Sequence, residues 1–318
     1  MATTKTSAAA VTPARGAGVS KRFDLARPSR QHILGYLLLT PAVLMVLLII
    51  AYPLIISIDL SLQDVKLPRI GETRKPFTFK NYERLFTSGE FWMACWITVK
   101  LVATVTVGAL LVGVSTALLV NQRFPGRALA RIAMALPWAV PEVIAVVIFA
   151  WIFDSSFGLM SWLLIKLGFA DQMVAWVSTP SAAFWALSLT MIWKGFPFVS
   201  IMTLAGLQSI PEDFYAAARV DGASALQRFR WITLPSLMPV LGVTVVLVML
   251  WVFRDFSIIK VLTGGGPLKT TQTLSIMTYD QAFGFFKFGY ASAVGVVTLV
   301  ICVVASLAML GRQSKAIY

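Results

Sequence analysis

The sequence contains few residues of the kinds that enzymes and metal sites depend on. One histidine, His32, and two cysteines, Cys95 and Cys302, occur among 318 residues. No CxxC, HExxH or EF-hand pattern is present, and the two thiols do not form a disulfide framework. We therefore expect no catalytic residue and no metal site.

Acidic residues are also scarce. Asp and Glu number 14 against 27 Lys and Arg, which gives a net charge of +13. A basic excess is typical of nucleic-acid binding in a soluble protein, but here the charges lie in loops and at the N-terminal end, beside apolar runs. We expect them to contact anionic lipid and to set the membrane topology, and we expect no nucleic-acid partner.

Apolar residues are abundant instead. They make up 58% of the chain, and the mean hydropathy is +0.80. Several apolar runs exceed the roughly 20 residues that cross a bilayer as a helix, so the sequence predicts an all-α integral membrane protein with six transmembrane helices. The expected spans are 33–58, 96–120, 132–153, 183–207, 237–261 and 290–310.

Prolines interrupt three of these spans. Pro41 and Pro53 are expected to break the first, and the fourth is expected to be interrupted at Gly195-Phe196-Pro197. In the third, Pro141 cannot donate a hydrogen bond to the carbonyl of Pro137, so that carbonyl must face protein or water.

Six spans place both termini on one side of the membrane. Residues 1–30 are basic and have no apolar core, which is typical of a disordered cytoplasmic tail, although an organelle transit peptide has the same bias. The loops on the side of the termini carry 14 Lys and Arg residues against 11 on the other side. Because positive charges in short loops have the strongest effect on topology, we expect both termini in the cytoplasm. Residues 31–318 are expected to form the six-helix transmembrane domain.

An apolar stretch at 159–165 is too short to span the membrane and predicts an interfacial helix.

One inner loop, residues 208–236, contains strong local signals. Ser209 and Glu212 have the spacing of a capping box, with Pro211 in the first turn. Three alanines propagate the helix, Asp221-Gly222 stops it, and a second helix is expected at 224–233. An ordinary helical hairpin and a docking surface for another protein fit these signals equally well.

The motif in this loop is Ala216-Ala217-Ala218, three residues, Gly222, nine residues and Ile232-Thr233-Leu234-Pro235. It resembles the coupling loop of binding-protein-dependent ABC importer permeases, which implies a type I ABC importer permease architecture. The sequence departs from the family at Ala216, where glutamate is common, so the resemblance implies no salt bridge there. The residues that it implies for coupling to the ATPase are Ala216, Ala217, Ala218, Arg219, Asp221, Gly222 and Ala223.

Other segments are similar to the sugar-type branch, which includes the maltose and glycerol-phosphate permeases. They are residues 136–141, 193–198 and 261–267, with the pairs Tyr52-Pro53 and Asn81-Tyr82. The resemblance implies a second permease subunit, two ATP-binding subunits and an extracytoplasmic solute-binding protein, in a cell inner membrane. It also implies that a partner binds ATP and that this chain has no cofactor of its own.

A glycine-rich segment follows the fifth span. It fails the P-loop spacing and no strand is expected before it, so we interpret it as a turn at the outer mouth that contacts the binding protein. Its residues are Gly264, Gly265, Gly266 and Pro267.

Ionisable residues inside spans are costly and are therefore candidates for function. We expect Glu142, Lys194, Arg254 and Asp255, with Trp193, to line a polar path for a sugar-like solute. Ion pairing between helices or snorkelling to the interface would explain these charges equally well. As helix neighbours, Arg254 and Asp255 would point about 100° apart and pair poorly. Four tryptophans could stack on sugar faces, although a single membrane tryptophan is more often a packing residue or an interface anchor. They are Trp138, Trp151, Trp193 and Trp251.

The alternative function is a self-sufficient secondary transporter or channel. Such a protein would need its own ion-coupling groups and often has internal inverted repeats. We find no convincing repeat in the sequence. The solute could be neutral, or it could be an anionic sugar derivative that Lys194 and Arg254 would accept.

Overall fold

The computed structural model describes residues 30–66 and 76–317, and those residues contain helices and loops but no strand. All but the last residue of the expected tail lies outside the described residues. The chain divides into two compact units, Met1–Pro53 and Leu54–Tyr318.

The first unit contains helix α1 (Arg30–Val46) and a π-helical turn, η1 (Leu47–Ala51). Pro41 lies inside α1, so the expected break at this residue is wrong. At the next expected break the chain stays helical. The N–H of Tyr52 reaches back to the carbonyl of Leu47, which widens the last turn before Pro53. Leu34–Ser61 is consequently one candidate span of 28 residues.

The second unit is built from long helices connected by short ones. The long helices are α4 (Gly89–Asn121), α8 (Pro180–Gln208), α11 (Leu234–Arg254) and α14 (Phe288–Ile317). The shorter ones are α2 (Tyr52–Ser61, from Leu54 onward), α3 (Lys80–Thr87), α5 (Arg127–Ala139), α6 (Glu142–Ile152), α7 (Leu159–Lys166), α9 (Glu212–Val220), α10 (Ala225–Arg228), η3 (Phe229–Thr233), α12 (Ser257–Leu262), α13 (Leu274–Tyr279) and η4 (Asp280–Gly284).

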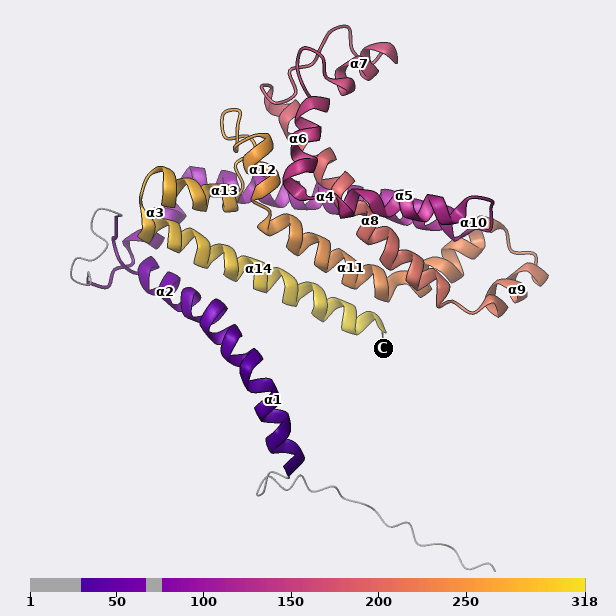
Figure 1. Ribbon diagram of the computed structural model, residues 1–318, viewed down its shortest axis with the longest axis horizontal. Helices are drawn as coiled ribbons and strands as arrows, with labels where there is room; N and C mark the ends of the chain where they lie inside the picture. The colour runs from indigo at the N-terminus through magenta and orange to yellow at the C-terminus, as the bar shows by residue number, and fades with distance from the viewer. Residues whose placement is uncertain (1–29, 67–75, 318) are drawn as a thin grey trace, which may run out of the picture. The chain divides into compact units, whose positions relative to one another are not determined.

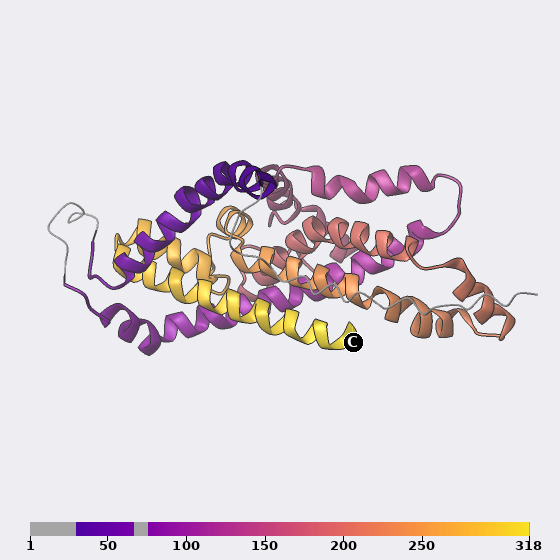
Figure 2. The same cartoon turned by 90° about the horizontal axis from the view of Figure 1, so that it is seen from below.

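Helices α4, α8, α11 and α14 run alongside one another (Figures 1 and 2). The closest pair is α4 and α8, because small residues let their backbones approach. A Cβ atom added at Gly113 would lie 2.5 Å from the Cβ of Val199, so only glycine fits there. One turn along α4, the hydroxyls of Thr116 and Ser200 form a hydrogen bond of 2.6 Å. The main hydrophobic core lies where α4 and α8 meet α11, α12 and α6.

Within residues 30–66 and 76–317, five helices are long and apolar enough to cross a membrane, or six if the bent pair α5 and α6 counts as one span. That pair is bent by 97° at residues 140–141. The expected interruption of the fourth span is wrong, since α8 runs through Pro197 and the Ser200 hydroxyl bonds the Phe196 carbonyl at 2.9 Å. The fifth span ends at Arg254, seven residues earlier than expected, because Asp255 has extended backbone.

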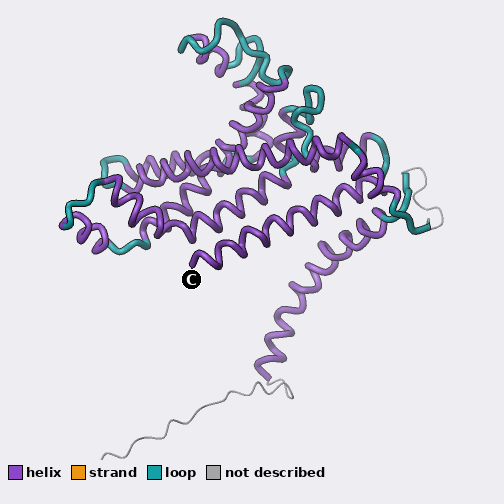
Figure 3. The backbone as a smooth tube through the Cα atoms, turned by 180° about the vertical axis from the view of Figure 1, so that it is seen from behind, coloured by secondary structure: helices purple, strands orange, loops and turns teal. Residues whose placement is uncertain are grey.

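Loops lie at both ends of the long helices, and others flank α7, which projects away from these helices (Figure 3). Helix α9 lies at one end, and α3 and α13 lie at the other (Figure 1). At the α3 end, the Asn81 amide donates to the carbonyls of Ser61 and Gln63, each at 2.9 Å, and fastens α2 to α3. The expected short helix at 159–165 is present as α7.

Candidate solute cavity and coupling loop

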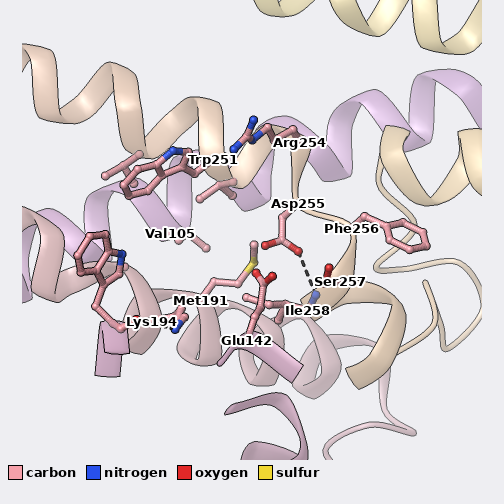
Figure 4. A pocket seen from close by; sticks show the side chains of 14 residues that line it. Val105, Glu142, Met191, Lys194, Trp251, Arg254, Asp255, Phe256, Ser257 and Ile258 are labelled. Carbon is pink, nitrogen blue, oxygen red and sulfur yellow. Dashed lines mark hydrogen bonds between the residues drawn. The ribbon is translucent and has the colours of Figure 1, made fainter. Parts of the chain in front are cut away.

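Four of the five residues predicted to line a polar path surround one cavity. It has a volume of about 370 Å³, and its lining includes Glu142, Lys194, Arg254 and Asp255 (Figure 4). Trp193, the fifth, is not in the lining; it packs against Phe149 with ring centroids 5.1 Å apart. The structure thus brings together side chains from α6, α8 and the end of α11.

The first wall of the cavity is the break between α5 and α6. The last hydrogen bond of α5 runs from the Val140 N–H to the Leu136 carbonyl at 3.3 Å, and α6 begins after Pro141. The carbonyls exposed by this break accept hydrogen bonds from the Lys194 ammonium on α8. Two are 3.1 Å long, to Pro137 and Trp138, and the third carbonyl is that of Val140.

The second wall is the break between α11 and α12. Arg254 is the last residue of α11, and the Asp255 carboxylate accepts a hydrogen bond of 3.1 Å from the N–H of Ile258 in the first turn of α12. The sequence predicted that these two residues are neighbours on one helix. This prediction is wrong, because α11 ends at Arg254. Asp255 instead satisfies a backbone donor that the start of a helix leaves unpaired.

Each charge at these breaks lies at a helix end of opposite polarity. Lys194 meets the carbonyl end of α5, and Glu142 is the first residue of α6. Arg254 ends α11, and Asp255 precedes α12. Cations are stabilised at helix C-termini and anions at N-termini, so broken helices explain why four ionisable residues are tolerated here. The carboxyl groups of Glu142 and Asp255 point toward each other and lie close together in the cavity lining (Figure 4).

Two of the four tryptophans named from the sequence, which we expected to be packing residues or interface anchors, also line the cavity. They are Trp138, between the two prolines, and Trp251, one turn before Arg254. Phe198 lies between them, with ring-centroid distances of 6.4 Å to Trp138 and 4.6 Å to Trp251. The signal that could have identified both is their position next to a helix break.

The coupling loop folds as its sequence predicts around Gly222. This glycine has φ of +76°, which ordinary residues rarely adopt, and nothing lies within 4 Å of where its Cβ would be. Its N–H bonds the Arg219 carbonyl at 3.1 Å, and the Ala223 N–H bonds the Ala218 carbonyl at 2.9 Å. These two bonds are a Schellman motif, which ends α9.

The expected start of this helix is wrong. Ser209 still belongs to the end of α8, where its hydroxyl bonds the Gly206 carbonyl at 2.8 Å, and α9 begins at Glu212 after Pro211. The capping box occurs instead at Ser224 and Gln227, at the start of α10. The second helix does not end at residue 233 either, because it continues through η3 into α11.

The loop is fixed to the long helices through Tyr215, and its other side chains are mostly exposed. The Tyr215 hydroxyl bonds the Thr233 hydroxyl at 2.9 Å, and Tyr215 packs on an apolar cluster that includes Leu207 and Leu237. Of the predicted coupling residues, Ala218 and Ala223 are half-buried, and the other five are exposed. Three apolar side chains beside them are largely exposed: Phe214 (56%), Val220 (88%) and Leu226 (74%).

The glycine-rich turn after α12 is held by threonines. The Thr271 hydroxyl donates to the Gly266 carbonyl at 2.6 Å and is 2.8 Å from the Thr263 hydroxyl. Gly264 is exposed and Gly265 is buried, while Gly266 and Pro267 are half-buried. An ion pair of 2.8 Å between Lys269 and Glu90 joins the turn to the start of α4.

The family model described as "binding-protein-dependent transport system inner membrane component" matches residues 109–311. This chain belongs to that family. The matched segment contains both helix breaks, the coupling loop and the glycine-rich turn.

Two curated relatives are 38% identical to this permease. One is the trehalose/maltose transport system permease protein MalF of Thermococcus litoralis, over 86% of this chain and 90% of the relative. The other is the sulfoquinovosyl glycerol transport system permease protein SmoG of Agrobacterium fabrum, over 86% and 89%. In the crystal structure of a bacterial ABC transporter involved in the import of alginate, one chain matches with a TM-score of 0.76 at 23% identity. That match covers 90% of this chain and 96% of the other, and it shows the shared fold.

The chain is therefore the membrane-spanning permease subunit of an ABC importer, located in the inner membrane with several helices. This assignment favours the importer over a self-sufficient secondary transporter or channel.

Proposed function

We propose that this permease carries a sugar or sugar derivative through the cavity between the two helix breaks. Trp138 and Trp251 offer aromatic faces on which sugar rings stack, and Glu142 and Asp255 offer acceptors for hydroxyl groups. The names of the relatives, a trehalose/maltose permease and a sulfoquinovosyl glycerol permease, support this solute class. The juxtaposition of aromatic rings and polar groups in one cavity carries the proposal.

The α9–α10 segment is the proposed contact with a separate ATPase. Its apolar side chains Phe214, Val220 and Leu226 stay largely exposed in the part of the chain that the structure describes, while its base is fixed by Tyr215. In this proposal the chain itself binds no ATP. Closure of an ATPase dimer displaces α9 and α10, and α11 follows because it continues from α10 without a loop.

The glycine-rich turn is the proposed contact with an extracytoplasmic solute-binding protein. The turn follows α12, beyond the end of α11 that lies away from α9 and α10 (Figure 1), and this position supports the proposal. The complete importer in this proposal contains a second permease subunit, two ATP-binding subunits and the binding protein, with both chain termini in the cytoplasm.

Purification and titration test this function. The permease should co-purify from its native membrane with an ATPase and a second permease, and its cognate binding protein should bind one of a panel of mono- and oligosaccharides in calorimetric titration. A permease that catalysed uptake alone in proteoliposomes, or a binding protein that bound only amino acids or peptides, would contradict the proposal.

A further inference from the structure

The break between α5 and α6 needs hydrogen-bond donors that its own backbone cannot supply. In a continuous helix the carbonyl of Pro137 would accept from residue 141, which is a proline without an N–H. Trp138 and Val140 lose their helical partners too, because the chain turns by 97° before α6 begins. Inside a membrane, water does not satisfy such carbonyls, so they require another part of the protein.

Lys194 supplies these donors from a different helix. Its ammonium group has three N–H bonds, and it reaches three carbonyls, those of Pro137, Trp138 and Val140. Among the residues that the structure describes, Lys194 has no carboxylate within ion-pair distance. All of its hydrogen-bonding capacity is therefore used by the backbone, and none is left for a solute in the cavity.

The residues on either side of this break form one wall of the cavity. Trp138 precedes Val140 by two residues and Glu142 follows it by two, and both line the cavity. The direction in which these side chains point depends on the angle between α5 and α6. Lys194 joins α8 to the chain at this bend.

We propose that Lys194 is a positioning residue of the transport path, which holds the α5–α6 break and the cavity wall in place and does not bind the solute. This inference assigns a role within the proposed solute path, but its test requires no solute. It also explains why a lysine is suited to this position. The lysine side chain is long enough to reach the break, and its ammonium group has one N–H donor for each of the three carbonyls.

Distance measurement across the break tests the proposal. In the complete transporter in lipid nanodiscs, with Cys95 and Cys302 replaced by serine, spin labels would be placed at Leu129 of α5 and Ile148 of α6, which are 71% and 45% exposed. Pulsed electron–electron double resonance then reports the distance distribution between the two helices. We expect Lys194→Met to shift and broaden this distribution and Lys194→Arg, which retains charge and donors, to restore it.

Two further variants separate positioning from general damage. Pro141→Ala returns an N–H to residue 141, so it should narrow the distribution of the Lys194→Met protein; a solute ligand would gain nothing from that change. Lys100→Met is the matched control, because Lys100 is a lysine on α4 that lies over the Phe184 ring, 4.2 Å from its centroid, outside the cavity. Its distribution should equal that of the unsubstituted protein.

An unchanged distribution in Lys194→Met would overturn the proposal. If Lys194→Met does not assemble, the comparison passes to Lys194→Gln, which has two donors and no charge. A Lys194→Gln protein that matches the parent distribution would be equally damaging. Because no sugar is present, either result leaves the proposed importer function intact.

Discussion

The coupling loop and the solute cavity are built in opposite ways. The loop is shaped by contacts between residues close in sequence: the Schellman bonds around Gly222 and the capping box of Ser224 and Gln227 span five residues or fewer. The cavity is shaped by contacts between distant residues, such as Lys194 with carbonyls 54 to 57 positions away. A segment held together by local hydrogen bonds keeps its conformation when it moves as a unit. A cavity formed by several helices changes shape when those helices move.

This difference suits the two proposed tasks. A segment that receives force from a partner must transmit it without unfolding, and α9 is tied to η3 at its base through Tyr215 and Thr233. A cavity that opens and closes must depend on contacts between separate helices. We therefore predict that substitutions that change the backbone conformation will have the largest effects on uptake in the loop. In the cavity, we predict that substitutions that remove a side-chain hydrogen bond will have the largest effects.

The largest expected effect is that of Gly222→Pro. Proline fixes φ near −65°, while residue 222 requires +76°, so the Schellman motif cannot form. We expect uptake to be abolished with the protein still present in the membrane, measured by radiolabelled sugar uptake and immunoblotting. Gly222→Asn is the control, because asparagine tolerates positive φ and the space is empty. Normal uptake by the proline variant would disprove the coupling role of the loop.

The next effect is expected at the second helix break. Asp255→Ala removes the cap of α12, which costs about 1 kcal/mol of local stability and should reduce uptake strongly. Asp255→Asn retains a side-chain oxygen that can accept from Ile258, so it should preserve most of the thermal stability. Equal losses of stability in the two variants would show that the charge, and not the cap, stabilises the break.

A smaller effect is expected at the base of the coupling loop. Tyr215→Phe removes one hydrogen bond to Thr233, worth about 1 kcal/mol, and should lower the uptake rate a few-fold at an unchanged solute affinity. Thr233→Val is the matched partner, and the double variant should be no slower than either single variant. Additive losses would indicate that the two hydroxyls act independently.

The smallest effect is expected at the surface of the loop. Arg123 and Glu212 form an ion pair of 3.5 Å in which both side chains are almost fully exposed. Exposed pairs contribute little, so Glu212→Gln should leave uptake and thermal stability unchanged. A marked loss of uptake would mean that Glu212 contacts a partner subunit directly.

The sequence predicts several local features, although it misplaces the capping box of the loop, and it misses the contacts between distant residues. The stop at Gly222 and the helix α7 follow from local signals, and the sequence anticipated an unpaired carbonyl at Pro137. It did not predict that Lys194 would satisfy that carbonyl, because the two residues lie on different helices. A proline in the sequence is also not sufficient to predict a helix break. Pro197 lies inside the continuous helix α8, which packs on α4, whereas Pro141 lies at a sharp bend.

The dependence on distant contacts also explains which of the predicted residues line the cavity. Four ionisable residues were singled out because charge is costly in a membrane, and these four lie around one cavity. Trp193 is a plausible surface for a sugar ring, yet it is adjacent to Lys194 on α8 and points in a different direction, so its ring packs on Phe149 instead. Which side of a helix faces a cavity is decided by tertiary packing.

Crosslinking from the tip of α9 tests the central claim most directly. With Cys95 and Cys302 replaced by serine, Val220→Cys presents a thiol at a position that is 88% exposed. We predict that a short bifunctional maleimide joins it to a cysteine-bearing ATPase subunit in inside-out vesicles, with a yield that changes when ATP and vanadate are added. Labelling of the same thiol by a membrane-impermeant reagent from outside intact cells, with no crosslink to an ATPase, would contradict the account.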